Sequence, residues 1–83
     1  MYDADAVRTV IQELLVSQYG GIEAAAPRVG VPHKTLHRAF TIGAKDRTKT
    51  VSFDLVMRVI AALNRDNPSI TVESVLEESS KRS

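Results

Sequence analysis

The chain contains no cysteine, and this absence excludes two kinds of structure. Neither a disulfide framework nor a thiolate metal site can form, which is consistent with an intracellular protein. The sequence also lacks a run of about 18 apolar residues and a basic segment followed by an apolar one at its start. We therefore expect no membrane span, no signal peptide and a cytoplasmic location.

A catalytic constellation is also missing from the pattern. A nucleophilic serine or threonine needs a base and an orienting group around a pocket. Both histidines, His33 and His37, instead fall on one side of a predicted helix without an evident carboxylate partner. Gly20 and Gly21 do not form a phosphate loop, because such loops follow a strand and need more glycines at set spacing. We expect no enzyme and no cofactor.

What the sequence does contain is apolar residues at helical spacing along most of its 83 residues. A chain of this length forms one small core that buries about 60 to 65% of the unfolded surface, so its stability should be modest. We predict an all-α fold, a compact bundle of about five helices over residues 1–78, with residues 79–83 as a flexible tail. Dimerisation would add stability.

The first predicted helix begins at Asp3 or Asp5, either of which can accept hydrogen bonds from the free amides of the first turn, and ends at Tyr19. Val16 falls on its polar side and should be exposed. Gly20 and Gly21 then end the helix. The apolar residues that share its other face are expected in the core: Val7, Val10, Ile11, Leu14 and Leu15.

Residues 22–42 form the central motif, two short helices joined by a tight turn. The turn residues Gly30, Val31 and Pro32 are too few to let the helices separate, so the helices must cross steeply. Gly30 suits the left-handed conformation that ends a helix, and Pro32 favours the start of the next. Val31 is expected to fill the corner. The inward residues of the two helices are Ile22, Ala25, Ala26, Val29, Leu36, Ala39 and Phe40.

The spacing of Ala26, Gly30, Val31 and Leu36 resembles the DNA-binding helix-turn-helix of the Cro/Xre repressor family. The wider pattern, over residues 20–64, is similar to small antitoxins of addiction modules. The resemblance implies a DNA-binding repressor that regulates transcription and, in its narrower form, an antitoxin that represses its own operon and neutralises a small toxin protein.

Pro27 departs from the family pattern, because it lies inside the first helix of the motif. A proline there removes a backbone donor and clashes with a full preceding turn. The helix should therefore begin late, near Glu23, or be kinked.

The second helix of the motif, from about Pro32 to Thr41, has a polar and cationic outward side. Such a side suits the major groove, where arginine or lysine donates to guanine and threonine contacts the thymine methyl. His33 and His37, at i and i+4, could alternatively chelate zinc, but no third ligand is evident and we predict no metal site. The predicted DNA contacts on this helix are His33, Lys34, Thr35, His37, Arg38 and Thr41.

Positive charge is concentrated on the motif and on the loop that follows it. Residues 28–49 hold six lysines and arginines against one aspartate, whereas the flanking segments are slightly acidic. Within the polar loop of residues 43–52, Lys45, Arg47 and Lys49 are predicted to contact phosphates. A mobile solubilising loop and a short extended segment over residues 48–51 are the alternatives that the sequence leaves open.

Two further helices complete the prediction. Ser52 caps a helix whose core stripe holds Phe53, Val56, Met57, Ile60 and Leu63, with Leu55, Val59 and Ala62 on a nearly opposite face. Thr71 caps a last helix that ends near Ser79. Because two reading helices are needed for successive grooves, we predict a homodimer. Its predicted interface consists of Val59, Ala62, Val72, Val75 and Leu76.

The sequence therefore favours a sequence-specific DNA-binding repressor of double-stranded DNA. The alternative is a protein-binding inhibitor on the same scaffold, for example a phage-encoded one, that applies the basic helix to an acidic partner surface.

Overall fold

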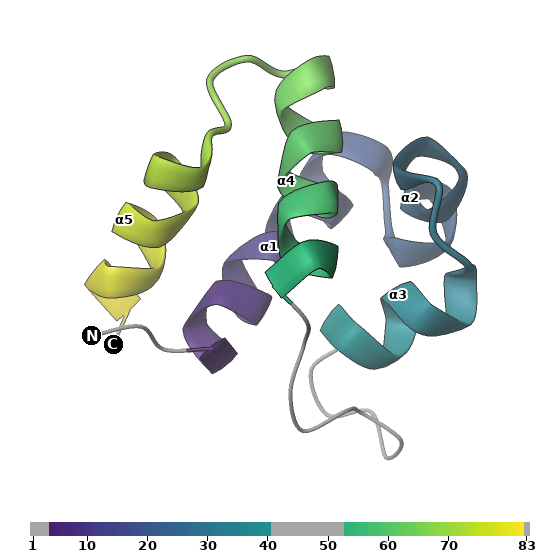
Figure 1. Ribbon diagram of the computed structural model, residues 1–83, viewed down its shortest axis with the longest axis horizontal. Helices are drawn as coiled ribbons and strands as arrows, with labels where there is room; N and C mark the ends of the chain where they lie inside the picture. Colours follow the sequence, from purple (N-terminus) through teal and green to yellow (C-terminus); the bar gives the residue numbers. More distant parts are fainter. Residues whose placement is uncertain (1–3, 41–52, 83) are drawn as a thin grey trace.

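The computed structural model describes residues 4–40 and 53–82 of the chain (Figure 1). Over these residues it contains five α-helices and no strand, so the predicted all-α fold is confirmed. No helix among them is both long and apolar enough to cross a membrane. The helices are α1 (Ala4–Tyr19), α2 (Ile22–Val29), α3 (His33–Phe40), α4 (Phe53–Asp66) and α5 (Val72–Arg82).

Helix α1 is the centre of the bundle, because it packs against each of the other four helices. In Figure 1 it runs behind α4, with α5 on one side and with α2 and α3 on the other. Val7, Ile11 and Leu15 are at most 1% exposed, whereas Val16 on the outer side is 50% exposed. The predicted division of α1 into two faces is confirmed. Each fully buried side chain of this kind stabilises the fold by about 1.5–3 kcal/mol.

Helix α2 contains Pro27 as its sixth residue and continues past it to Val29. The helix begins at Ile22, one residue before the late start that the sequence predicted. The proline removes one intrahelical hydrogen bond, the one to the carbonyl of Glu23, and Glu23 lies at the exposed surface where water can replace it. The exposed position of Pro27 and of the Glu23 carbonyl therefore makes this proline tolerable.

Helix α4 buries a broader face than its predicted core stripe. Val59 and Ala62, assigned to a second face, are 0% and 7% exposed and belong to the same core as Val56, Ile60 and Leu63. Phe53, predicted to be in the core, is instead 67% exposed. The helical wheel identified which sides of α4 are apolar, but not which of them the neighbouring helices cover.

The same burial corrects the predicted dimer interface. Val59, Ala62 and Val75 are each at most 7% exposed within a single chain, so their side chains are not available to a second copy. That part of the prediction is wrong, because one core already uses them. Val72 is half-buried and Leu76 is 42% exposed, so these two remain accessible.

Helix α5 begins with a capping box, in which two side chains satisfy each other's backbone amides. The amide of Ser74 donates to Thr71 Oγ1 over 3.0 Å, and the amide of Thr71 donates to Ser74 Oγ over 2.8 Å. The helix extends to Arg82, and Ser79 is only 5% exposed. The predicted cap at Thr71 is confirmed, whereas the predicted tail of residues 79–83 is wrong for residues 79 to 82.

Candidate nucleic-acid interface

The turn between α2 and α3 has the backbone conformation that its sequence predicts. Gly30 lies in the left-handed region at φ 80° and ψ 29°. The amides of Gly30 and Val31 both donate to the carbonyl of Ala26, over 2.9 and 3.2 Å, which closes the end of α2. Val31 is 7% exposed and fills the corner between the helices. A Cβ atom at Gly30 would meet nothing within 4 Å, so the requirement for glycine comes from the backbone angle rather than from lack of space.

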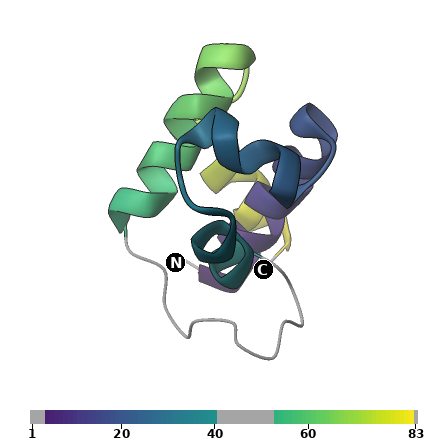
Figure 2. The ribbon, with the colours of Figure 1, turned by 90° about the vertical axis from the view of Figure 1, so that its right-hand side faces the viewer.

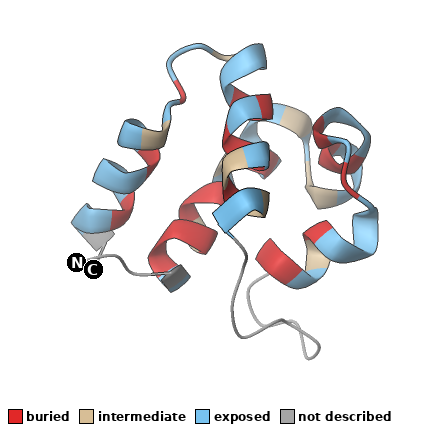
Figure 3. Ribbon diagram, in the orientation of Figure 1, coloured by how far each residue is buried: buried red, intermediate tan, exposed pale blue. Residues whose placement is uncertain are grey.

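Helix α3 starts directly after this turn, and the amide of Leu36 donates to the carbonyl of Pro32 over 3.0 Å. Its inward residues Leu36, Ala39 and Phe40 are at most 3% exposed. The helix has no acidic residue. Figure 3 shows the contrast between the buried and the exposed side of α3, and Figure 2 shows α3 at the lower edge of the described residues.

The outward side of α3, which we call the reading face, consists of His33, Lys34, Thr35, His37 and Arg38. Four of these residues are exposed and His37 is half-buried. The imidazole centroids of His33 and His37 are 5.9 Å apart, with the rings tilted by 50°. Together with Lys34 and Arg38 they surround a shallow hollow of about 170 Å³. Thus the structure brings together five of the residues that the sequence predicted to contact DNA.

The remaining predicted contacts, Thr41, Lys45, Arg47 and Lys49, lie outside the described residues, as does the predicted loop of residues 43–52. The alternative of a zinc site receives no further ligand from the described part of the chain. Within residues 4–40 and 53–82 there is no group of three or more side chains that could hold a metal ion. The paired histidines there offer two nitrogen ligands, fewer than the three protein ligands of a typical zinc site.

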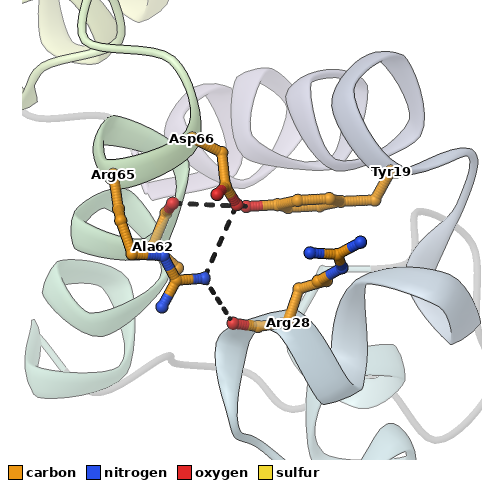
Figure 4. A network of polar contacts seen from close by, with 5 residues as sticks. All are labelled: Tyr19, Arg28, Ala62, Arg65 and Asp66. Carbon is orange, nitrogen blue, oxygen red and sulfur yellow. Dashed lines mark hydrogen bonds and ion pairs between the residues drawn. The ribbon is translucent and has the colours of Figure 1, made fainter.

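A polar network that the sequence did not predict holds the end of α2 in place (Figure 4). The hydroxyl of Tyr19, at the end of α1, donates to Asp66 Oδ2 over 2.6 Å and lies 3.3 Å from the carbonyl oxygen of Ala62. Arg65 Nη2 donates to the carbonyl of Arg28 over 3.0 Å and lies 3.5 Å from Asp66 Oδ2. We call this network the Tyr19 clamp; it ties the last turn of α2 to the ends of α1 and α4.

The clamp changes the titration of its two acidic groups. Burial, followed by the hydrogen bond to Asp66, raises the pKa of Tyr19 to about 12. The hydrogen bond from Tyr19 is the main cause that lowers the pKa of the Asp66 carboxyl below its ordinary value. The network is therefore intact with a neutral phenol and an ionised carboxylate, the protonation states that both groups hold near neutral pH.

No short-range sequence signal would have revealed the clamp, because Tyr19 and Asp66 are 47 positions apart. The clamp matters to the site because Arg65 bonds to the last turn of α2, directly before the turn that leads into α3. Comparison with protein-family models, with curated proteins and with solved structures finds no match to this chain.

Proposed function

We propose that the protein binds double-stranded DNA in a sequence-specific manner by placing α3 in the major groove. The observation that carries this proposal is the division of α3 into a fully buried apolar side and an outward side with cations and no carboxylate. The major groove is about 12 Å wide and admits one α-helix. An eight-residue helix at the edge of the molecule has the dimensions for that contact.

The side chains of the reading face match the donors and acceptors of base edges. Arg38 and Lys34 can donate to the O6 and N7 atoms of guanine, and the methyl group of Thr35 can contact a thymine methyl. His33 and His37 add ring N–H donors on the same side. A face that served only for solvation would not need to exclude acidic residues, and the positive charge of the chain is concentrated on residues 28–49.

Repression of transcription is the role that we infer for such binding, because a protein on a promoter blocks access to it. Neutralisation of a small toxin protein and a cytoplasmic location rest on the sequence alone and stay predictions. The protein-binding alternative uses the same reading face, so an experiment has to separate the two.

Selection from a library of random DNA duplexes tests the proposal without knowledge of the operator. We expect a defined motif to be enriched, and binding to that motif to weaken with rising salt as phosphate contacts release counterions. Binding without an enriched motif would show that the contact is unspecific. Absence of binding at low salt would favour an acidic protein surface as the partner.

The matched variants for this experiment are Lys34→Ala on the reading face and Lys81→Ala on α5. Both remove one exposed lysine from a helix, so they change the net charge equally. Lys81 Nζ lies 4.0 Å from Glu77 Oε1. Its helix, α5, is on the other side of the bundle from α3 (Figure 1). Lys34→Ala should weaken binding to the enriched motif, whereas Lys81→Ala should leave it unchanged.

A further inference from the structure

A hollow lies between the start of α3 and the first two turns of α4. Its volume is about 350 Å³, at the lower end of the roughly 300–1,000 Å³ that is common for small-molecule sites. The lining combines apolar side chains with one hydroxyl, one carboxylate and one guanidinium group. The residues that line it are Val31, Pro32, Thr35, Asp54, Leu55 and Arg58.

The two charged residues of the hollow, Asp54 and Arg58, are one helical turn apart on α4 and are both exposed. An acidic residue four positions before a basic one on a helix is the arrangement that favours an ion pair. Within the described part of the chain, however, neither of these side chains forms an ion pair. Both charges therefore remain available to a ligand that carries the complementary groups.

We propose that this hollow binds a free amino acid with an apolar side chain. In such a zwitterion the carboxylate and the ammonium group are separated by a single carbon atom, so both can lie between protein groups one helical turn apart. The guanidinium of Arg58 can donate two parallel hydrogen bonds to the carboxylate. The carboxylate of Asp54 can accept a hydrogen bond from the ammonium group.

The rest of the lining selects the same class of ligand. Val31 is 7% exposed and Leu55 is half-buried, so together they form an apolar floor on which the side chain of the amino acid can pack. An inorganic anion could pair with Arg58 but would be repelled by Asp54. A segment inside a protein chain has neither a free ammonium group nor a free carboxylate on its backbone, so it cannot satisfy both charges.

Thr35 connects the hollow to the reading face, because it belongs to both. In this respect the inference rests on the proposed function. An amino acid seated against Thr35 occupies space beside α3 that a DNA groove needs, so the ligand and DNA should compete. Because the coupling between two binding sites is reciprocal, each should lower the affinity for the other by the same factor.

Isothermal titration calorimetry in the absence of DNA tests the site itself. The probes are the free L-amino acids valine, leucine, isoleucine, methionine and phenylalanine, each beside its N-acetyl derivative and its methyl ester. We expect at least one free amino acid to bind. Its N-acetyl derivative lacks the ammonium group and its methyl ester lacks the carboxylate, so each should bind about tenfold more weakly.

Two substitutions assign the charged groups of the protein. Arg58→Gln and Asp54→Asn should each raise the Kd of the free amino acid about tenfold. Arg58→Gln should cause no further loss with the methyl ester, because the group that it would contact is already absent. Lys81→Gln and Glu73→Gln on α5 are the matched controls, since both remove an exposed charge outside the hollow, and they should bind like the wild type. Circular dichroism should show the same helix content in all four variants.

Three results would overturn the site. The first is a wild-type chain that binds none of the free amino acids up to tens of millimolar. The second is equal affinity for a free amino acid and both of its derivatives. The third is a loss of affinity in the control variants as large as that in Arg58→Gln.

The competition with DNA is measured separately, by titrating the selected duplex with and without the bound amino acid. The ligand should lower the affinity of the wild type for DNA, whereas the same concentration should have little effect on Arg58→Gln. An unchanged affinity in the wild type would overturn the competition. If the chain binds the amino acid but no DNA, the site stands and the proposed function is wrong. If it binds the duplex but no amino acid, the reverse holds.

Discussion

The two sides of α3 differ in what they contact: one packs into the core, and the other is the proposed contact with DNA. The inward side, Leu36, Ala39 and Phe40, is at most 3% exposed and has contacts that reach into the common core. The outward side, the reading face, makes no contribution to that core. Substitutions on the inward side should therefore change stability first and binding only as a consequence. Substitutions of the exposed residues on the outward side should change binding with little effect on stability.

Leu36→Ala should produce the largest effect on stability. Leu36 is 0% exposed, and removal of a buried leucine side chain leaves a cavity, so we expect a loss of about 2–5 kcal/mol in the free energy of unfolding. Urea denaturation followed by circular dichroism measures this loss. Lys34→Ala, two residues away on the outward side, should shift the same curve by no more than about 0.5 kcal/mol. Equal shifts in the two variants would contradict the division of α3 into two sides.

Gly30→Val should have the next largest effect, because it changes the crossing of α2 and α3. Gly30 lies at φ 80°, which a β-branched residue adopts only at a cost of about 1–2 kcal/mol. The melting temperature and the affinity for DNA should both fall. Gly30→Asn is the control, since asparagine tolerates the left-handed region, and it should be milder than valine. If the valine variant melts like the parent, the turn is not held in this conformation.

Tyr19→Phe should give a smaller loss, a decrease of a few degrees in the melting temperature, because it removes the hydroxyl of the clamp from a partly exposed site. The loss should depend on pH. The lowered pKa of Asp66 means that its contribution is present above its ordinary pKa of 3.8 and is lost as the pH falls through the folded value. The raised pKa of Tyr19 means that its contribution is present below pH 10 and is lost as the pH rises toward about 12.

The difference in melting temperature between the wild type and Tyr19→Phe should therefore be widest near neutral pH and should shrink toward both extremes. Melting curves recorded from acid to alkaline pH provide the measurement. A difference that stays constant across the range would show that the hydroxyl does not act through the carboxylate of Asp66. Because no side chain of the clamp belongs to the reading face, the variant should keep its preference for the selected duplex.

The sequence predicts features that depend on residues close together in the chain better than features that depend on distant residues. The turn at Gly30, the two faces of α1 and the cap at Thr71 are determined by residues within a few positions of each other, and these predictions are confirmed. The Tyr19 clamp depends on helices that meet only in the folded chain, which no local pattern contains. Nor does any pattern in α1 indicate that Arg8 is only 2% exposed.

Helix α4 also shows that local spacing does not determine which apolar face the other helices cover. Its spacing predicts apolar residues on two faces, but the choice of face depends on where the other helices lie. The structure buries Val56, Ile60 and Leu63 of the predicted core stripe as expected, adds Val59 and Ala62 to the same core, and leaves Phe53 exposed. The predicted dimer interface loses Val59, Ala62 and Val75 for this reason, because the core of a single chain already buries them.

Lys49→Ala tests the predicted phosphate contact outside the reading face, and we expect no change in stability. Lys49 lies outside the described residues, and its role is predicted from its position in the basic segment of the sequence. Loss of one phosphate contact should weaken binding to all duplexes alike and reduce the salt slope by about one per contact, or about two in a dimer. Titrations at several salt concentrations measure that slope. A change in sequence preference would instead make this segment a reader of bases.

The central claim, that α3 reads base edges, is tested most directly by titrating the wild type and Arg38→Ala against the selected duplex and a shuffled one. Arg38 lies on the reading face, where a guanine contact contributes about 1–3 kcal/mol of discrimination. We expect Arg38→Ala to lose that amount on the selected duplex and little on the shuffled one, so that the two affinities converge. An equal loss on both duplexes, with the preference of the wild type retained, would contradict the claim.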